Sequence, residues 1–147
     1  MSDPLRHATV NEDGDFVCLA LLYGADGAAV NQAAVSSIVL TVSPLKKTTN
    51  SDNETAWVLD ADKTQTDYTG SSAPAVASTI YDSLQTDAIQ WPNPPHTTGY
   101  NFRHVIPGAA IPDGATNYQA DFTLTMADGT TMVVSFGVLT RKRYTDD

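Results

Sequence analysis

The histidines are the first candidates for chemistry, because an imidazole can bind a metal ion or transfer a proton near neutral pH. They are His7, His96 and His104, which lie far apart in the sequence. Metal sites usually take two ligands from positions only a few residues apart. The spacing therefore predicts no zinc site. His104 follows Arg103 on an expected strand, and we interpret it as a polar surface group.

Two acidic runs are candidate calcium ligands. Residues 11–15 read Asn-Glu-Asp-Gly-Asp, and residues 60–62 read Asp-Ala-Asp. The second run begins like a calcium-binding loop, but Gln65 stands where that loop needs glycine and Ser71 where it needs glutamate. The first is interpreted as a polar turn before a strand. We expect no bound metal, with a weak calcium site in a loop as the alternative.

Motifs for catalysis do not emerge from the sequence. It contains no Gly-x-Ser-x-Gly elbow, phosphate-binding loop or dinucleotide-binding motif. Carboxylates are numerous enough for a glycosidase pair, but nothing singles out two of them. Cys18 lies in the apolar run of residues 16–23 and is interpreted as a small core residue. We therefore expect a protein that is not an enzyme and uses no cofactor.

Charge and composition narrow the range of partners. The 147 residues carry a formal net charge of -9, and such an acidic surface repels nucleic acid and anionic membranes. No apolar stretch approaches the roughly 20 residues of a membrane span, and the first residues lack the apolar segment of a signal peptide. The single cysteine excludes an intrachain disulfide. We expect synthesis in a reducing cytoplasm and neither a nucleic-acid nor a membrane partner.

Alternating apolar residues predict strands along most of the chain. Residues 16–23 are apolar throughout, which is typical of a central strand buried on both faces. Residues 37–43 alternate, and residues 56–59 and 101–106 are predicted as shorter strands. Residues 76–84 fit either a helix or a strand. The polar residues 44–55 and 60–75 are predicted to be loops.

The closing segment predicts a β-hairpin over residues 117–139. Apolar side chains occupy every second position before and after Asp128 and Gly129. A two-residue turn would place Met132 and Val134 on the wrong face, whereas a three-residue loop, 127–129, pairs Leu124 with Met132. The pattern thus selects a type I turn with Gly129 left-handed in a bulge.

Together these elements predict an all-β fold, a single antiparallel β-sandwich over residues 1–147 that is either immunoglobulin-like or jelly-roll-like. Short arms at both ends of the chain would flank it. We expect the strands to pack apolar faces against one another and leave the outer surface for binding.

Contact with a partner is expected at aromatic and basic residues outside the predicted core. Trp57 neighbours apolar residues and is assigned to the core, while Trp91 precedes a stiff, proline-rich stretch. A sugar-stacking platform is the alternative use of the aromatic residues, but we favour a protein contact. The predicted partner-binding residues are Trp91, His96, Tyr100, Arg141, Lys142 and Arg143.

Three strings in the second half of the chain carry a family resemblance. They are Ile-Tyr-Asp-Ser-Leu-Gln-Thr at residues 80–86, Gly-Tyr-Asn-Phe-Arg-His at 99–104 and Pro-Asp-Gly at 112–114, followed by Tyr118 and the hairpin. The chain resembles small, uncharacterised β-rich structural proteins of tailed bacteriophages over roughly residues 76–140. The motif at 99–104 brings no active-site residue with it.

The resemblance implies a virion component without cofactors. The favoured role is a capsid decoration protein that binds and stabilises the outer head surface, since an acidic protein suits the outside better than the side facing DNA. A neck or tail component, or a carbohydrate-binding module for host attachment, is the alternative. The expected partners are the major capsid protein or other virion proteins, and copies of this chain in a homo-oligomer.

Overall fold

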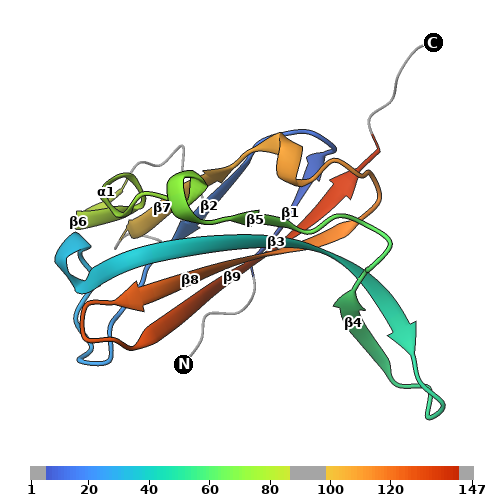
Figure 1. The fold of residues 1–147 in the computed structure, drawn as a ribbon, viewed down its shortest axis with the longest axis horizontal. Helices are drawn as coiled ribbons and strands as arrows, with labels where there is room; N and C mark the ends of the chain where they lie inside the picture. Colours follow the sequence, from blue (N-terminus) through green and yellow to red (C-terminus); the bar gives the residue numbers. More distant parts are fainter. Residues whose placement is uncertain (1–5, 87–98, 143–147) are drawn as a thin grey trace.

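The computed structural model describes residues 6–86 and 99–142, and nearly every element in them is a strand (Figure 1). The predicted all-β class is confirmed. The strands are β1 (Arg6–Asn11), β2 (Phe16–Ala20), β3 (Val35–Thr49), β4 (Thr55–Leu59), β5 (Thr66–Tyr68), β6 (Ile80–Gln85), β7 (Tyr100–Ile106), β8 (Asn117–Met126) and β9 (Thr131–Arg141). The helical segments are α1 (Val76–Thr79) and 3-10 turns at Gln32–Ala34, Gly70–Ser72 and Gly108–Ala110.

The strands form two sheets that pack together as a sandwich, as predicted. One sheet has the order β1-β9-β8-β3-β4, with β5 also paired to β3, and the other has the order β2-β7-β6. All pairs are antiparallel except β1 with β9. Parallel neighbours need a long connection. Here β1 and β9 meet from opposite ends of the described chain, so the intervening strands supply that connection.

The strand order separates the two predicted sandwich types. Strands B, E and D of an immunoglobulin domain correspond to β2, β7 and β6, and strands C′, C, F and G correspond to β4, β3, β8 and β9. The connectivity is therefore immunoglobulin-like. Antibody domains join strands B and F by a disulfide. In this chain Cys18 on β2 is a free, buried thiol, as predicted.

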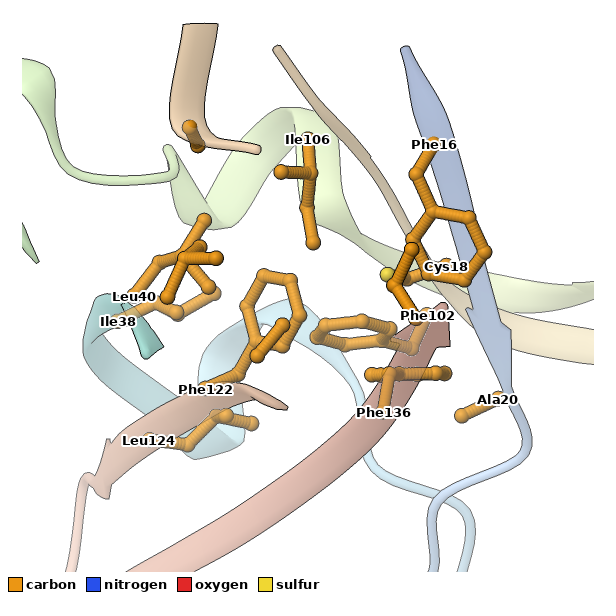
Figure 2. Packing of buried hydrophobic residues seen from close by; sticks show 14 of the residues in the cluster. Phe16, Cys18, Ala20, Ile38, Leu40, Phe102, Ile106, Phe122, Leu124 and Phe136 are labelled. Carbon is orange, nitrogen blue, oxygen red and sulfur yellow. The ribbon is translucent and has the colours of Figure 1, made fainter. Parts of the chain in front are cut away.

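Aromatic rings fill the centre of the sandwich (Figure 2). The fully buried Phe122 ring lies 4.9 Å from Phe102 and 5.7 Å from Phe136 between ring centroids, in edge-to-face geometry. The His104 ring packs edge-on against Phe122 at 5.5 Å. His104 is thus partly buried, and its prediction as a surface group is wrong. Burial, with the charge of Arg103, lowers the pKa of His104.

The closing hairpin, β8 and β9, has the predicted register. Phe122 pairs with Val134 and Leu124 with Met132, so the apolar residues of both strands lie on the core side. Gly129 has a φ of 89°, and its N–H donates to the carbonyl of Met126. The three-residue loop is confirmed because only an odd loop keeps both apolar stripes on one face.

Several predicted segment boundaries are wrong, for reasons of strand pairing. The run 16–23 is not a central strand: β2 ends at Ala20, lies at the edge of its sheet and leaves Val17 exposed. Part of the loop predicted at 44–55 continues β3 to Thr49, and the loop at 60–75 contains β5. Residues 76–84 combine both alternatives, since the single helical turn α1 leads directly into β6.

A buried tyrosine ties the start of β8 to the preceding loop. The hydroxyl of Tyr118 accepts a hydrogen bond from the N–H of Asp113 at 3.1 Å, five residues upstream. This is the arrangement of the tyrosine corner in immunoglobulin-like sandwiches. Burial raises the pKa of Tyr118 to about 12, opposed by the hydrogen bond from the Asp113 backbone.

Replacing Tyr118 by phenylalanine should remove a pH dependence as well as about 1–2 kcal/mol of stability. The folded state holds the Tyr118 proton more tightly than the unfolded chain, whose tyrosine pKa is near 10.0. Its contribution is therefore complete below pH 10 and is lost as the pH rises toward 12. Urea unfolding between pH 8 and 12 should show a smaller alkaline loss for Tyr118→Phe than for the wild type. Equal losses would contradict the assignment.

A second buried hydroxyl has the opposite expectation. Thr79 is fully buried at the end of α1, and its Oγ1 has no hydrogen-bond partner among the described residues. The isosteric change Thr79→Val removes an unpaired polar atom and should stabilise the fold by about 1 kcal/mol. Thr140 is the matched control, because its buried Oγ1 accepts from the N–H of Thr116. Thr140→Val should cost about 1–3 kcal/mol in thermal unfolding, and a loss for both variants would refute the distinction.

Candidate assembly surface on the arm formed by β3 and β4

The far half of β3 leaves the sandwich together with β4. The first half of β3 contributes Ile38, Leu40 and Val42 to the core, but the pairing with β8 ends at Leu45. Beyond that point β3 pairs only with β4, from Leu45 with Leu59 to Thr49 with Thr55. Residues 45–59 therefore form an arm, and Figure 1 shows it projecting away from the body of the molecule.

Hydrogen bonds hold both ends of the arm. At its tip, Asn50 Oδ1 accepts from the N–H groups of Asp52 and Glu54, both at 2.9 Å. At its base, the N–H of Asp60 donates to the carbonyl of Pro44. Just beyond, Lys63 Nζ donates to Thr116 Oγ1 at 2.7 Å. These contacts give the arm a defined direction from the sandwich.

The arm exposes apolar side chains that the core does not use. All five residues of β4 are exposed, including Trp57 at 53% and Leu59 at 48%. Because paired residues share a face, Leu45, Trp57 and Leu59 lie on one side, and we call these three side chains the apolar patch; Lys47, the cross-strand partner of Trp57, lies on the same side. From Ile38 onward the even-numbered residues of β3 face the core. The patch consists of odd-numbered residues and therefore faces outward. Val58 lies on the opposite side of the arm.

The assignment of Trp57 to the core is therefore wrong. The sequence does carry a signal against this assignment. Trp57, Val58 and Leu59 are consecutive, and neighbouring strand residues point to opposite faces. At least one of them had to point away from any single core. The arm extends past Asn117, the first residue of β8, and all five residues of β4 are exposed, so no described sheet packs against either face of the arm.

The residues predicted to contact a partner do not gather at one described place. Trp91, His96 and Arg143 lie outside the described residues. Tyr100 is only 4% exposed and packs with Leu19 and Tyr81, so its side chain serves the fold. Arg141 and Lys142 are exposed at the end of β9, where the carbonyl of Arg141 accepts from the N–H of Glu12.

The motif Gly-Tyr-Asn-Phe-Arg-His at 99–104 is used to build the sandwich. Gly99 has a φ of 86°, and an added Cβ would lie 2.3 Å from the carbonyl oxygen of Gln85. Asn101 is buried, and its amide bonds the backbone of Leu22 and Val30. Phe102 belongs to the aromatic core. The motif thus specifies packing.

Burial explains the shifted pKa of the one cysteine in the chain. Burial raises the pKa of the Cys18 thiol, which disfavours the nucleophilic thiolate.

In residues 6–86 and 99–142, no cluster of three or more histidine, cysteine or acidic side chains could hold a metal ion. Both acidic runs contain a turn, and their carboxylates accept backbone hydrogen bonds: Asp15 Oδ1 accepts from the N–H of the distant Gly108, and Asp60 Oδ1 accepts from the N–H of Asp62. No helix in the described segments is long and apolar enough to cross a membrane.

Comparison of the chain with protein families, with curated proteins and with solved structures finds no match. The resemblance to phage proteins therefore depends on the sequence strings alone. The arm, in contrast, is seen directly in the strand pairing of β3 and β4.

Proposed function

We propose that this protein is a bacteriophage virion structural protein without catalytic activity, and specifically a capsid decoration protein. The apolar patch of Leu45, Trp57 and Leu59 carries the proposal, because Trp57 and Leu59 are exposed and Leu45 is only partly buried. These side chains add little to the stability of the sandwich, and exposed apolar groups gathered on a projecting element are typical of a protein contact. Through this patch the protein would bind the outer surface of the head.

Charge supports the outer surface over the interior. The net charge of -9 opposes the approach of packaged DNA, whose phosphates are negative. Many copies, each bridging capsid subunits through its arm, would sum modest contacts into a large stabilisation of the head. The major capsid protein is the expected partner, a homo-oligomer the expected state, and the virion the expected location. A neck or tail component could use the same arm.

One observation favours a carbohydrate-binding module as the second candidate. Trp57 is exposed on the face of a sheet, and sugars stack on such rings. However, its cross-strand partner is Lys47 and its apolar neighbours are leucines, while the other highly exposed aromatic residue of the described chain, Tyr23, lies in the loop after β2. No row of aromatic rings therefore lies beside Trp57 among the described residues, and tryptophan is one of the residues that most often dominate protein contacts.

The test is binding of purified protein to heads assembled without it, followed by heating. We expect the wild type to bind and to raise the temperature at which heads release DNA. Trp57→Ser should weaken binding at least about 30-fold, the effect of losing a central aromatic contact. Because Trp57 is exposed, the unfolding free energy should change by no more than about 0.5 kcal/mol.

Tyr23→Ser is the matched control, since Tyr23 is 54% exposed but lies outside the arm. It should bind heads like the wild type. Binding only to tails would move the protein to the neck or tail. A glycan-array signal that depends on Trp57, without binding to any virion part, would favour the carbohydrate module and reject decoration.

A further inference from the structure

The pairing of β4 with β3 shows which backbone N–H and C=O groups of β4 point toward its outer, unpaired edge. Glu54 O accepts from Asn50 N, and Asp60 N donates to Pro44 O, so these two pairs are hydrogen-bonded. In an antiparallel ladder the bonded pairs alternate with non-bonded ones. Ala56 and Val58 therefore bond to β3, while the N–H and C=O groups of Thr55, Trp57 and Leu59 point away from it. No described strand pairs with that edge.

The edge lacks the usual protection against strand pairing. Natural proteins blunt edge strands with lysine, proline or a bulge. Thr55–Leu59 contains neither proline nor charge, and its register with β3 is continuous from end to end. Threonine, tryptophan and valine also favour strands. The arm thus offers an edge without a bulge or a charged residue, with three donors and three acceptors.

We propose that this edge binds an extended strand of a partner protein, and that this strand carries a basic residue at each end of the paired segment. Acidic side chains at both ends of β4 support the choice, because Glu54 precedes the strand and Asp60 follows it. The inference rests on the proposed function and deepens it by naming the chemistry of the capsid segment that the arm would recognise. Strand addition supplies backbone bonds, and alternate side chains would cover the apolar patch.

A second copy of this chain fits the edge less well. Two β4 strands paired antiparallel about Trp57 would set Glu54 of each copy opposite Asp60 of the other. Like charges directly opposite on paired strands are destabilising. The same positions filled by lysine or arginine would give attraction, so charge favours a different protein with basic ends.

The edge can be tested apart from the apolar patch. Thr55→Pro removes an N–H on the free side of β4, where proline is tolerated, and leaves every patch side chain in place. We expect it to weaken head binding about tenfold, while Thr55→Ala, which keeps the N–H, changes binding less than about twofold. If Thr55→Pro binds like the wild type while Trp57→Ser does not, strand addition is overturned and the proposed function stands.

A peptide probe tests the edge without heads. The probe has seven residues, a lysine at each end and threonine alternating with valine between. At about 1 mM it should shift the amide resonances of Thr55, Trp57 and Leu59 in ¹⁵N-labelled protein and slow their hydrogen exchange. A version ending in glutamate should bind about tenfold more weakly. Equal binding of both peptides, no shift on β4, or a dimer held through β4 would overturn the proposal.

If the wild type fails to bind any virion part while the lysine peptide binds β4, the proposed function fails and the strand-binding edge remains. Spectra of Thr55→Pro also report whether the arm is still folded. Should that variant lose the arm, the peptide comparison on the wild-type chain decides the matter alone.

Discussion

Replacing Asn101 by aspartate is expected to destabilise the fold by about 4 kcal/mol at neutral pH. Asn101 is 1% exposed, and its amide nitrogen donates to the carbonyls of Leu22 and Val30 at 3.0 and 2.9 Å. Its Oδ1 accepts from the N–H of Leu22 at 2.8 Å. A carboxylate has the same shape but would present a negative oxygen to two carbonyl oxygens in a buried place.

The defect should depend on pH. Burial against carbonyls would raise the pKa of the new carboxyl group in the folded state above its unfolded value near 3.9. The penalty is then largest above that pH range and shrinks as acid protonates the group in the folded protein. Urea unfolding of wild type and Asn101→Asp at pH 4 and pH 7 should give a smaller difference at pH 4.

Asn31→Asp is the matched control. Asn31 is exposed, and its Oδ1 only accepts a hydrogen bond, from the N–H of Ala34 at 3.0 Å, which a carboxylate also does. This change should stay within about 0.5 kcal/mol of the wild type. Equal effects at both positions would show that Asn101 does not pin the loop between β2 and β3.

Truncation of Phe122 to alanine should cost about 3–5 kcal/mol, because it empties the centre of the core. The ring is fully buried and meets Phe102 and Phe136, which come from the two different sheets (Figure 2). It also meets the His104 ring. The lost contacts therefore weaken the packing of one sheet on the other. Denaturant unfolding followed by circular dichroism of the strands would measure the change.

Val133→Ala provides the control for Phe122→Ala. Val133 lies on the neighbouring strand β9, pairs with Thr123 and is 59% exposed on the outer face. It should change the unfolding free energy by no more than about 0.5 kcal/mol. A loss of less than about 1.5 kcal/mol for Phe122→Ala would show that the aromatic contacts do not hold the two sheets together.

Local patterns predicted those parts of the fold that depend on neighbouring residues. The hairpin register followed from the two-residue period of the side chains around Gly129, since an error of one position would expose Phe122. The burial of Cys18 followed from its apolar run. The class of fold, a β-sandwich, followed from the number of such strands and turns.

The candidate site could not be predicted in the same way. Trp57 has apolar neighbours whether it is buried or exposed, and only the length of β3 relative to β8 decides between the two. Tyr100 was expected at a contact, yet the opposing residues Leu19 and Tyr81 bury it. Both outcomes depend on residues distant in the sequence.

The amino-acid pattern alone establishes which residues alternate, where the closing hairpin turns and that the chain is acidic. The immunoglobulin-like strand order, and the extension of β3 and β4 past the sandwich with Trp57 exposed, follow from contacts between distant segments. Alternation depends on the geometry of one strand, whereas burial depends on whether another sheet lies opposite.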